Sequence, residues 1–132
     1  MPLEARLAAV KSTRHLYADC FDQRCAPVLN GEPGENPLNY ICYMFWDVTP
    51  IAHWEDDPER AMFYDAILAV LEPALYSRND ACVQGALHGL GHIKAYTGDK
   101  VPLVIGRFLE KRSDLRNELV TYARACATGH IL

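Results

Sequence analysis

Two stretches that lie 34 residues apart share one register, and this internal repeat constrains the fold more than any other feature of the sequence. Leu75-Tyr-Ser-Arg-Asn-Asp80 aligns with Leu109-Glu-Lys-Arg-Ser-Asp114, which keeps leucine, arginine and aspartate in equivalent places. A period of this length is typical of repeated units that each contain a helix, a tight turn and a second helix. The repeat therefore predicts two helical hairpins, over residues 58–98 and 99–132. Further apolar pairs in this register are Ile67 with Val101, Val70 with Val104, Leu71 with Ile105 and Ala74 with Phe108.

The first 57 residues predict N-terminal helices and an acidic loop. Residues 4–24 carry apolar side chains at mixed three and four spacing, without an internal glycine or proline, which is typical of an amphipathic helix. The stretch 30–37 is rich in glycine and proline and predicts an exposed loop. Residues 38–48 predict a short helix, although their β-branched and aromatic content leaves a strand as an alternative.

Start and stop signals bound the helices of the hairpins. Asp57-Pro58 predicts a helix start, with aspartate as the N-cap and proline as the first helical residue. Pro73 should kink this helix or end its last regular turn. Asn79 or Asp80 should cap the next helix, which residues 97–99 close.

The second helices of the two hairpins differ in one face. In the first hairpin this face is apolar, and at the equivalent positions of the second hairpin it is polar. This difference is expected when a helix that is buried on both sides is followed by a terminal helix whose outer side meets water. The positions are Val83, Leu87 and Leu90 in the first hairpin, and Asn117, Thr121 and Arg124 in the second.

The segment ILAVLEPALYSRNDACVQGALHGLGHI, residues 67–93, resembles a HEAT (armadillo-type) repeat, with a weaker second copy that ends at residue 127. It has an apolar helix with proline, a short turn with aspartate, and a second helix of Val-x-x-Ala-Leu-x-x-Leu-Gly-x-Ile form. The resemblance implies a short α-solenoid-like stack of antiparallel helical hairpins and a protein-binding function. We therefore expect an all-α fold of about five or six helices in a single helical domain, residues 1–132.

Composition excludes some classes of partner and location. Half of the 132 residues are apolar and the formal net charge is −4, which argues against general binding to the nucleic-acid backbone. The sequence has neither the apolar core of a secretory signal nor a stretch that resembles a membrane span, so we expect a cytoplasmic protein that is not membrane-bound. Acids dominate residues 31–65 and bases dominate residues 100–124, which predicts an electrically asymmetric molecule.

His88 and His92 stand four residues apart on a predicted helix, so both rings point to one side and are candidate metal ligands. The residues between them lack the glutamate of the metalloprotease pattern, and a third ligand would have to come from another element. The same face carries Gly85 and Gly89, which would let a neighbouring helix approach closely. This position favours packing or hydrogen bonding for the two histidines over metal binding.

The segment from Tyr40 to Tyr64 holds seven aromatic residues together with Asp47, His53 and an acidic run. One interpretation is an aromatic, acidic groove for a cationic ligand or basic peptide, in which Trp54 has a surface role. The other interpretation is core packing. Under it, Tyr40, Tyr43, Phe45 and Phe63 seal the first helices against the hairpins.

Two functions remain open at this stage. The first is a non-enzymatic interaction module or adaptor that binds a protein partner or a second copy of itself, without a cofactor. The second is a small enzyme or a metal- or ligand-binding protein that uses His88 and His92, with Asp47 or His53 brought near them by folding. The sequence favours the first, because it contains no complete set of catalytic residues.

Overall fold

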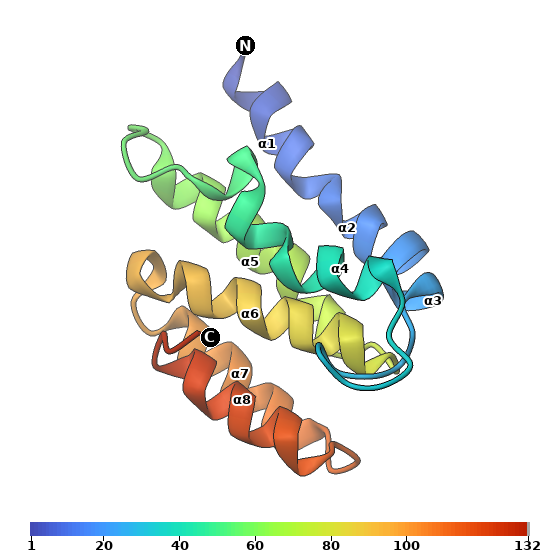
Figure 1. Ribbon diagram of the computed structural model, residues 1–132. Coiled ribbons are helices and arrows are strands. Elements are labelled where there is room, and N and C mark those ends of the chain that lie inside the picture. Colours follow the sequence, from blue (N-terminus) through green and yellow to red (C-terminus); the bar gives the residue numbers. More distant parts are fainter. Residues whose placement is uncertain (132) are drawn as a thin grey trace.

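The structure is a computed structural model in which residues 1–131 are described, and its regular elements are all helical over that range (Figure 1). The expectation of about five or six helices is confirmed by α1 and α4 to α8. The alternative of a strand over residues 38–48 is wrong, because these residues form α4. The elements are α1 (Leu3–Lys11), α2 (Thr13–His15), the π-helix η1 (Leu16–Phe21), α3 (Asp22–Arg24), α4 (Pro37–Val48), the 3₁₀-helix η2 (Pro50–Ala52), α5 (Arg60–Ala74), α6 (Asp80–Thr97), α7 (Lys100–Lys111) and α8 (Asn117–Ala127).

The N-terminal segment departs from the regular helix predicted over residues 4–24. Its middle turns form the π-helix η1, in which each residue bonds to the fifth residue before it. Tyr17 and Phe21 both point into the core from this segment, and the Tyr17 hydroxyl accepts a 2.6 Å hydrogen bond from Trp46 Nε1. The wider turn therefore keeps these two aromatic side chains on one buried face.

Capping side chains fix where the helices begin. Asn36 starts α4 by accepting a hydrogen bond from Leu38 N. Asn79 starts α6 in the same way, and its amide also donates to the carbonyl of Cys25, which holds the end of the N-terminal helices against α6. The start predicted at Asp57-Pro58 is wrong by two residues, because Asp57 Oδ1 caps a turn at Glu59 N and α5 begins only after it.

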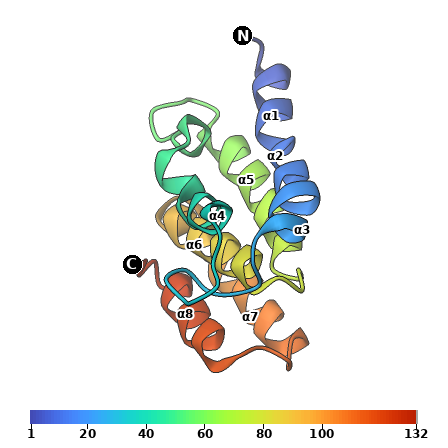
Figure 2. The same cartoon turned by 45° about the vertical axis from the view of Figure 1, so that its right-hand side comes forward.

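Helix α6 lies in the centre of the fold. Figures 1 and 2 show it between α4 and α8, and it packs against α4, α5, α7 and α8. Most of its residues are buried, including the apolar face of Val83, Leu87 and Leu90. Four neighbouring helices cover these buried faces, whereas Asp80, Gln84 and His92 form a polar stripe that stays half-exposed.

Helix α8 has the polar outer face that its sequence predicts. Asn117, Thr121 and Arg124 are exposed, which confirms that this side of the helix turns to water. The predicted separation of acidic and basic segments is partly cancelled in the fold, because Arg116 pairs with Glu32 at 2.7 Å. Among the described residues, no helix is long and apolar enough to cross a membrane.

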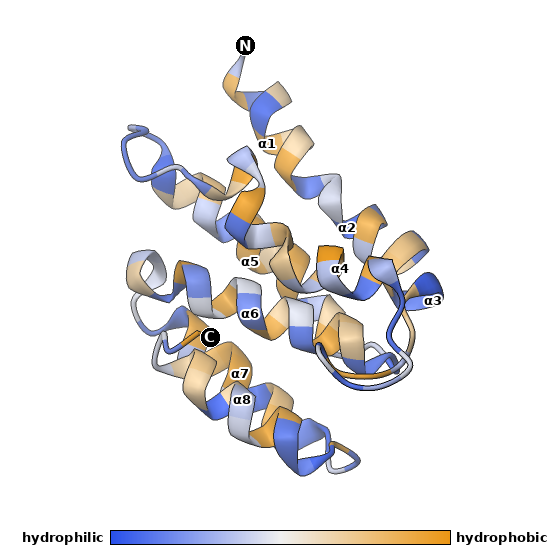
Figure 3. Ribbon diagram, viewed as in Figure 1, coloured by the Kyte–Doolittle hydropathy of each residue, from blue (hydrophilic) through white to orange (hydrophobic). Residues whose placement is uncertain are grey.

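The aromatic segment contributes to the core in most places. Phe63 is buried, and Tyr43 and Phe45 are half-buried. Tyr40, however, is 60% exposed, so the expectation that it seals the core is wrong. Helix α4 turns Trp46 toward α6, and Tyr40 is left on its outer side. The loop that follows η2 is strongly hydrophilic (Figure 3).

Candidate metal centre

Three side chains from two helices converge on one point. Asp47 lies in the last turn of α4, and His88 and His92 lie one turn apart on α6. The Asp47 carboxylate oxygens lie 2.7 Å from His88 Nε2 and 2.9 Å from His92 Nε2. The two Nε2 atoms are 3.2 Å apart. The atoms of the three residues that could ligate a metal ion all lie within 4.8 Å of one another.

The glycine face of α6 makes this convergence possible. A Cβ atom at Gly85 would lie 2.9 Å from the carbonyl oxygen of Cys42, and one at Gly89 would lie 2.5 Å from the ring of Trp46. Because these positions carry no side chain, α4 approaches α6 closely enough for Asp47 to reach both imidazoles. The predicted close approach of a neighbouring helix to this face is confirmed, and the neighbour is α4.

Burial is uneven across the cluster. The His88 side chain is only 2% exposed, whereas the side chains of Asp47 and His92 are 25% and 26% exposed. Solvent therefore reaches the cluster from the side of Asp47 and His92. Burial lowers the pKa of His88, while its hydrogen bond to Asp47 acts in the opposite direction. The lowered pKa favours the neutral imidazole, which is the form that binds metal ions.

Tyr122 on α8 holds the inner side of the His88 ring. Its hydroxyl lies 2.6 Å from His88 Nδ1 and 3.3 Å from the hydroxyl of Tyr43, whose ring packs against that of His88. An ionised Asp47 can only accept hydrogen bonds, so His88 Nε2 carries the proton in this arrangement and Nδ1 accepts from Tyr122. Burial raises the pKa of Tyr122, which keeps its hydroxyl protonated for that role.

The candidate residues from the sequence fall into two groups. The structure brings together Asp47, His88 and His92. His53 and Trp54 lie outside this cluster: the His53 ring is exposed and lies 3.8 Å from Glu55, and the Trp54 ring stacks on Phe63 with centroids 3.7 Å apart. The stacking makes Trp54 a half-buried packing residue, which favours the core interpretation over the surface role for this side chain.

Sequence reasoning missed the role of Tyr43 and Tyr122. A signal for each was present: Tyr43 precedes Asp47 by one helical turn, and Tyr122 is the equivalent of His88 in the 34-residue register. Helix α8 packs on α6, and this contact brings the Tyr122 hydroxyl to His88.

The spacing of the two imidazole nitrogens is compatible with a shared metal ion. Two nitrogen ligands that are 3.2 Å apart subtend an angle of about 100° at an ion with bonds of about 2.0–2.1 Å. That angle lies between the octahedral and tetrahedral values. An ion between the three groups would replace the hydrogen bonds that now join Asp47 to the two imidazoles.

No protein-family model, curated protein or solved structure matches this chain. The fold and the side-chain cluster together define an all-helical protein with a candidate metal centre. The chemistry of that centre is therefore the basis for a functional proposal.

Proposed function

We propose that this protein binds one divalent transition-metal ion through Asp47, His88 and His92. The observation that carries the proposal is the convergence of two imidazole nitrogens and a carboxylate within 4.8 Å. Two helices, a glycine-lined contact and the hydrogen bond from Tyr122 hold these groups in place. Preorganisation of this kind lowers the entropic cost of binding an ion.

The donor set selects the class of metal. Imidazole suits zinc, copper, iron, cobalt and nickel, whereas calcium and magnesium favour sites built from oxygen ligands alone. Two histidines and one carboxylate also form a three-ligand set that leaves positions for water or another small molecule. The partial exposure of Asp47 and His92 gives such a molecule access.

The charge of the loaded centre favours an anion in those positions. A divalent ion with one carboxylate and two neutral imidazoles leaves a net charge of about +1 in a partly buried site. A small carboxylate or similar anion would neutralise this charge. This chemistry is the ligand-binding role that the sequence left as its second function.

The test is a titration of the chelator-treated, dialysed protein with Co²⁺ and Zn²⁺, followed by calorimetry and by the visible absorption of Co²⁺. We expect one ion per chain and a rise of the melting temperature. A native chain that binds neither ion at micromolar concentrations would contradict the proposal. The cluster would then be a hydrogen-bonded link between α4 and α6.

Replacing Tyr122 with phenylalanine is expected to weaken Co²⁺ binding by about 10- to 100-fold, the usual effect of losing an outer-shell partner. When His88 Nε2 binds an ion, its proton must sit on Nδ1, and Tyr122 must then accept where it donated before. The hydroxyl can turn to Tyr43, which lies 3.3 Å away, so native Tyr122 can serve both states. Competition calorimetry measures the change.

Tyr40→Phe is the matched control for this variant, because Tyr40 is exposed on α4 and lies outside the cluster. We expect it to bind Co²⁺ with native affinity. Equal affinity in native protein and Tyr122→Phe would show that the hydroxyl does not position His88. Weaker Co²⁺ binding in both variants would point to a general effect of removing a tyrosine hydroxyl.

We also propose that α5 to α8 form a short α-solenoid-like stack, as the HEAT resemblance implies. Two observations support this proposal. Arg112, in the turn of the second hairpin, donates to the carbonyls of Leu75 and Ser77 in the turn of the first hairpin, at 3.1 and 2.6 Å. Helix α6 also packs on both helices of the second hairpin, α7 and α8.

A second candidate function is protein binding, for which α4 offers a specific surface. Its outer side carries Tyr40, Ile41 and Val48, which are 60%, 54% and 74% exposed. Ile41 and Val48 are seven residues apart and share one face of the helix. An exposed apolar stripe of this kind is typical of an interaction site, and self-association is the simplest use of it.

Sedimentation velocity tests this second candidate. We expect the native protein to show a concentration-dependent dimer near 100 µM, on the order of a weak interface, and the Ile41→Lys/Val48→Lys variant to stay monomeric. Both substitutions are at exposed positions, so the variant should keep native helix content. A native chain that stays monomeric over this range would reject self-association through α4.

A further inference from the structure

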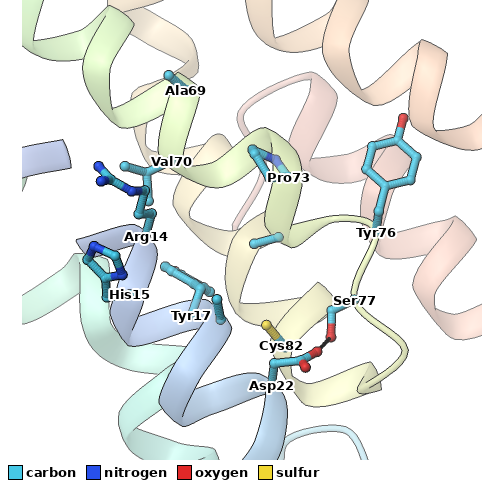
Figure 4. Close-up of a pocket in the computed structure, with 12 residues that line it drawn as sticks. Arg14, His15, Tyr17, Asp22, Ala69, Val70, Pro73, Tyr76, Ser77 and Cys82 are labelled. Atoms are coloured by element: carbon cyan, nitrogen blue, oxygen red, sulfur yellow. Dashed lines mark hydrogen bonds between the residues drawn. The ribbon is translucent and has the colours of Figure 1, made fainter. Parts of the chain in front are cut away.

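A second site lies where the N-terminal helices diverge from α5. Helices α1 and α2 pack on α5, but η1 packs on α4 and α6. The divergence leaves a half-open cavity of about 510 Å³ between η1 and the C-terminal half of α5 (Figure 4). This volume falls within the range of small-molecule sites, roughly 300–1,000 Å³.

The cavity is apolar along its length and charged at its ends. Tyr17, Val70 and Cys82 are buried residues of its wall, and alanines at positions 18, 69 and 74 leave its space unfilled. Figure 4 shows Arg14 and His15 together at one end, and Asp22 with Ser77 at the other. The π-helix η1 contributes Tyr17 and Ala18, and π-helical turns occur frequently at functional sites.

The two ends differ in what they can bind. Among the described residues, Arg14 has no carboxylate within salt-bridge distance, and its one hydrogen bond is a long one, 3.3 Å to the carbonyl of Lys11. Its guanidinium is therefore available for a carboxylate ligand. Asp22 accepts a hydrogen bond from Ser77, and its negative charge would repel an anion at that end.

We propose that this cavity binds a medium-chain fatty acid, with the carboxylate on Arg14 and the alkyl chain along Tyr17 and Val70 toward Cys82. Segregated polarity points to this ligand class: an apolar wall takes a saturated chain, and one cationic end takes one negative charge. The acidic far end selects against a ligand with a carboxylate at both ends. The site is independent of the metal centre, which uses different residues.

Calorimetry with octanoate on the full chain, in the presence of a chelator, tests the proposal. We expect one octanoate per chain with a dissociation constant on the order of 0.1 mM. Octanedioate, which has the same length and two carboxylates, should bind at least about tenfold more weakly, because its second carboxylate would meet Asp22. Octan-1-ol should also bind about tenfold more weakly, because it lacks the charge.

Variants locate the site. Arg14→Gln should weaken octanoate binding about tenfold, whereas Arg24→Gln, on exposed surface outside the cavity, should leave it unchanged. Ala69→Trp or Ala18→Trp should fill the cavity and abolish binding, and both positions are exposed, so the fold should tolerate them. The proposal is overturned if native protein gives no heat with octanoate, if octanedioate binds equally well, or if the tryptophan variants bind as native protein does.

Discussion

His92→Ala protein is expected to bind Co²⁺ at least about 100-fold more weakly than native protein, with its helix content intact. Losing one of three ligands should cost more than losing an outer-shell partner, which typically costs 10- to 100-fold. His92 is the best ligand to remove, because its side chain is 26% exposed and that of His88 is 2% exposed. Deleting His88 would also leave a buried cavity and remove the 2.6 Å partner of the Tyr122 hydroxyl.

Thermal melting gives an independent measure of the same effect. At a Co²⁺ concentration about 100 times the dissociation constant, binding stabilises the native protein by about 2.7 kcal/mol. For a chain of this size, that corresponds to a rise in melting temperature on the order of 10 °C. His92→Ala should show no such rise at the same Co²⁺ concentration.

His53→Ala is the matched control, since His53 is an exposed histidine whose near partner is Glu55. It should bind Co²⁺ and melt as native protein does. Native-like binding by His92→Ala would rule out the proposed ligand set. An equal loss of Co²⁺ affinity in His53→Ala and His92→Ala would indicate adventitious binding to surface histidines.

Gly85→Ala is expected to lower the free energy of unfolding by about 2 kcal/mol, although alanine is the better helix former. The added Cβ would lie 2.8 Å from the Cys42 sulfur and 2.9 Å from the Cys42 carbonyl oxygen. A backbone atom cannot move aside without moving the whole of α4. The overpacking cost should therefore exceed the gain in helix propensity, which is about 0.5–1 kcal/mol.

Gly106→Ala is the control for this prediction, because it makes the same chemical change in a helix where nothing lies within 4 Å of the new Cβ. It should raise the free energy of unfolding by about 0.5–1 kcal/mol. Urea denaturation followed by circular dichroism measures both variants. A Gly85→Ala protein as stable as Gly106→Ala would mean that α4 does not approach α6 this closely.

Much of the helical architecture could be predicted from local signals. Asn79 was one of two predicted caps, with Asp80, and it is Asn79 that starts α6. The polar substitutions at Asn117, Thr121 and Arg124 correctly indicated an exposed face of α8. The π-helix within residues 4–24 was not predicted, and its Tyr17 contacts Trp46, which is distant in the sequence. A pattern of apolar spacing does not contain such a contact.

The candidate metal centre was predicted only in part, for a physical reason. Helical spacing alone places His88 beside His92. Asp47 joins them through the packing of α4 on α6, which is a tertiary contact. The sequence offered His53 as an equal candidate for that place, and only the direction of the chain after η2 separates the two. The packing of α4 against Gly85 and Gly89 places Asp47, rather than His53, beside the two histidines.

The central position of α6 has a consequence for how cooperatively the molecule unfolds. Each of the four surrounding helices covers a part of α6 that is apolar, so none can detach without exposing some of that surface to water. Helices α4 and α5 and the second hairpin should therefore unfold together rather than in turn. Partial opening, and the faster amide exchange that reports it, should be confined to the periphery, while the amides of α6 exchange slowly, through global unfolding.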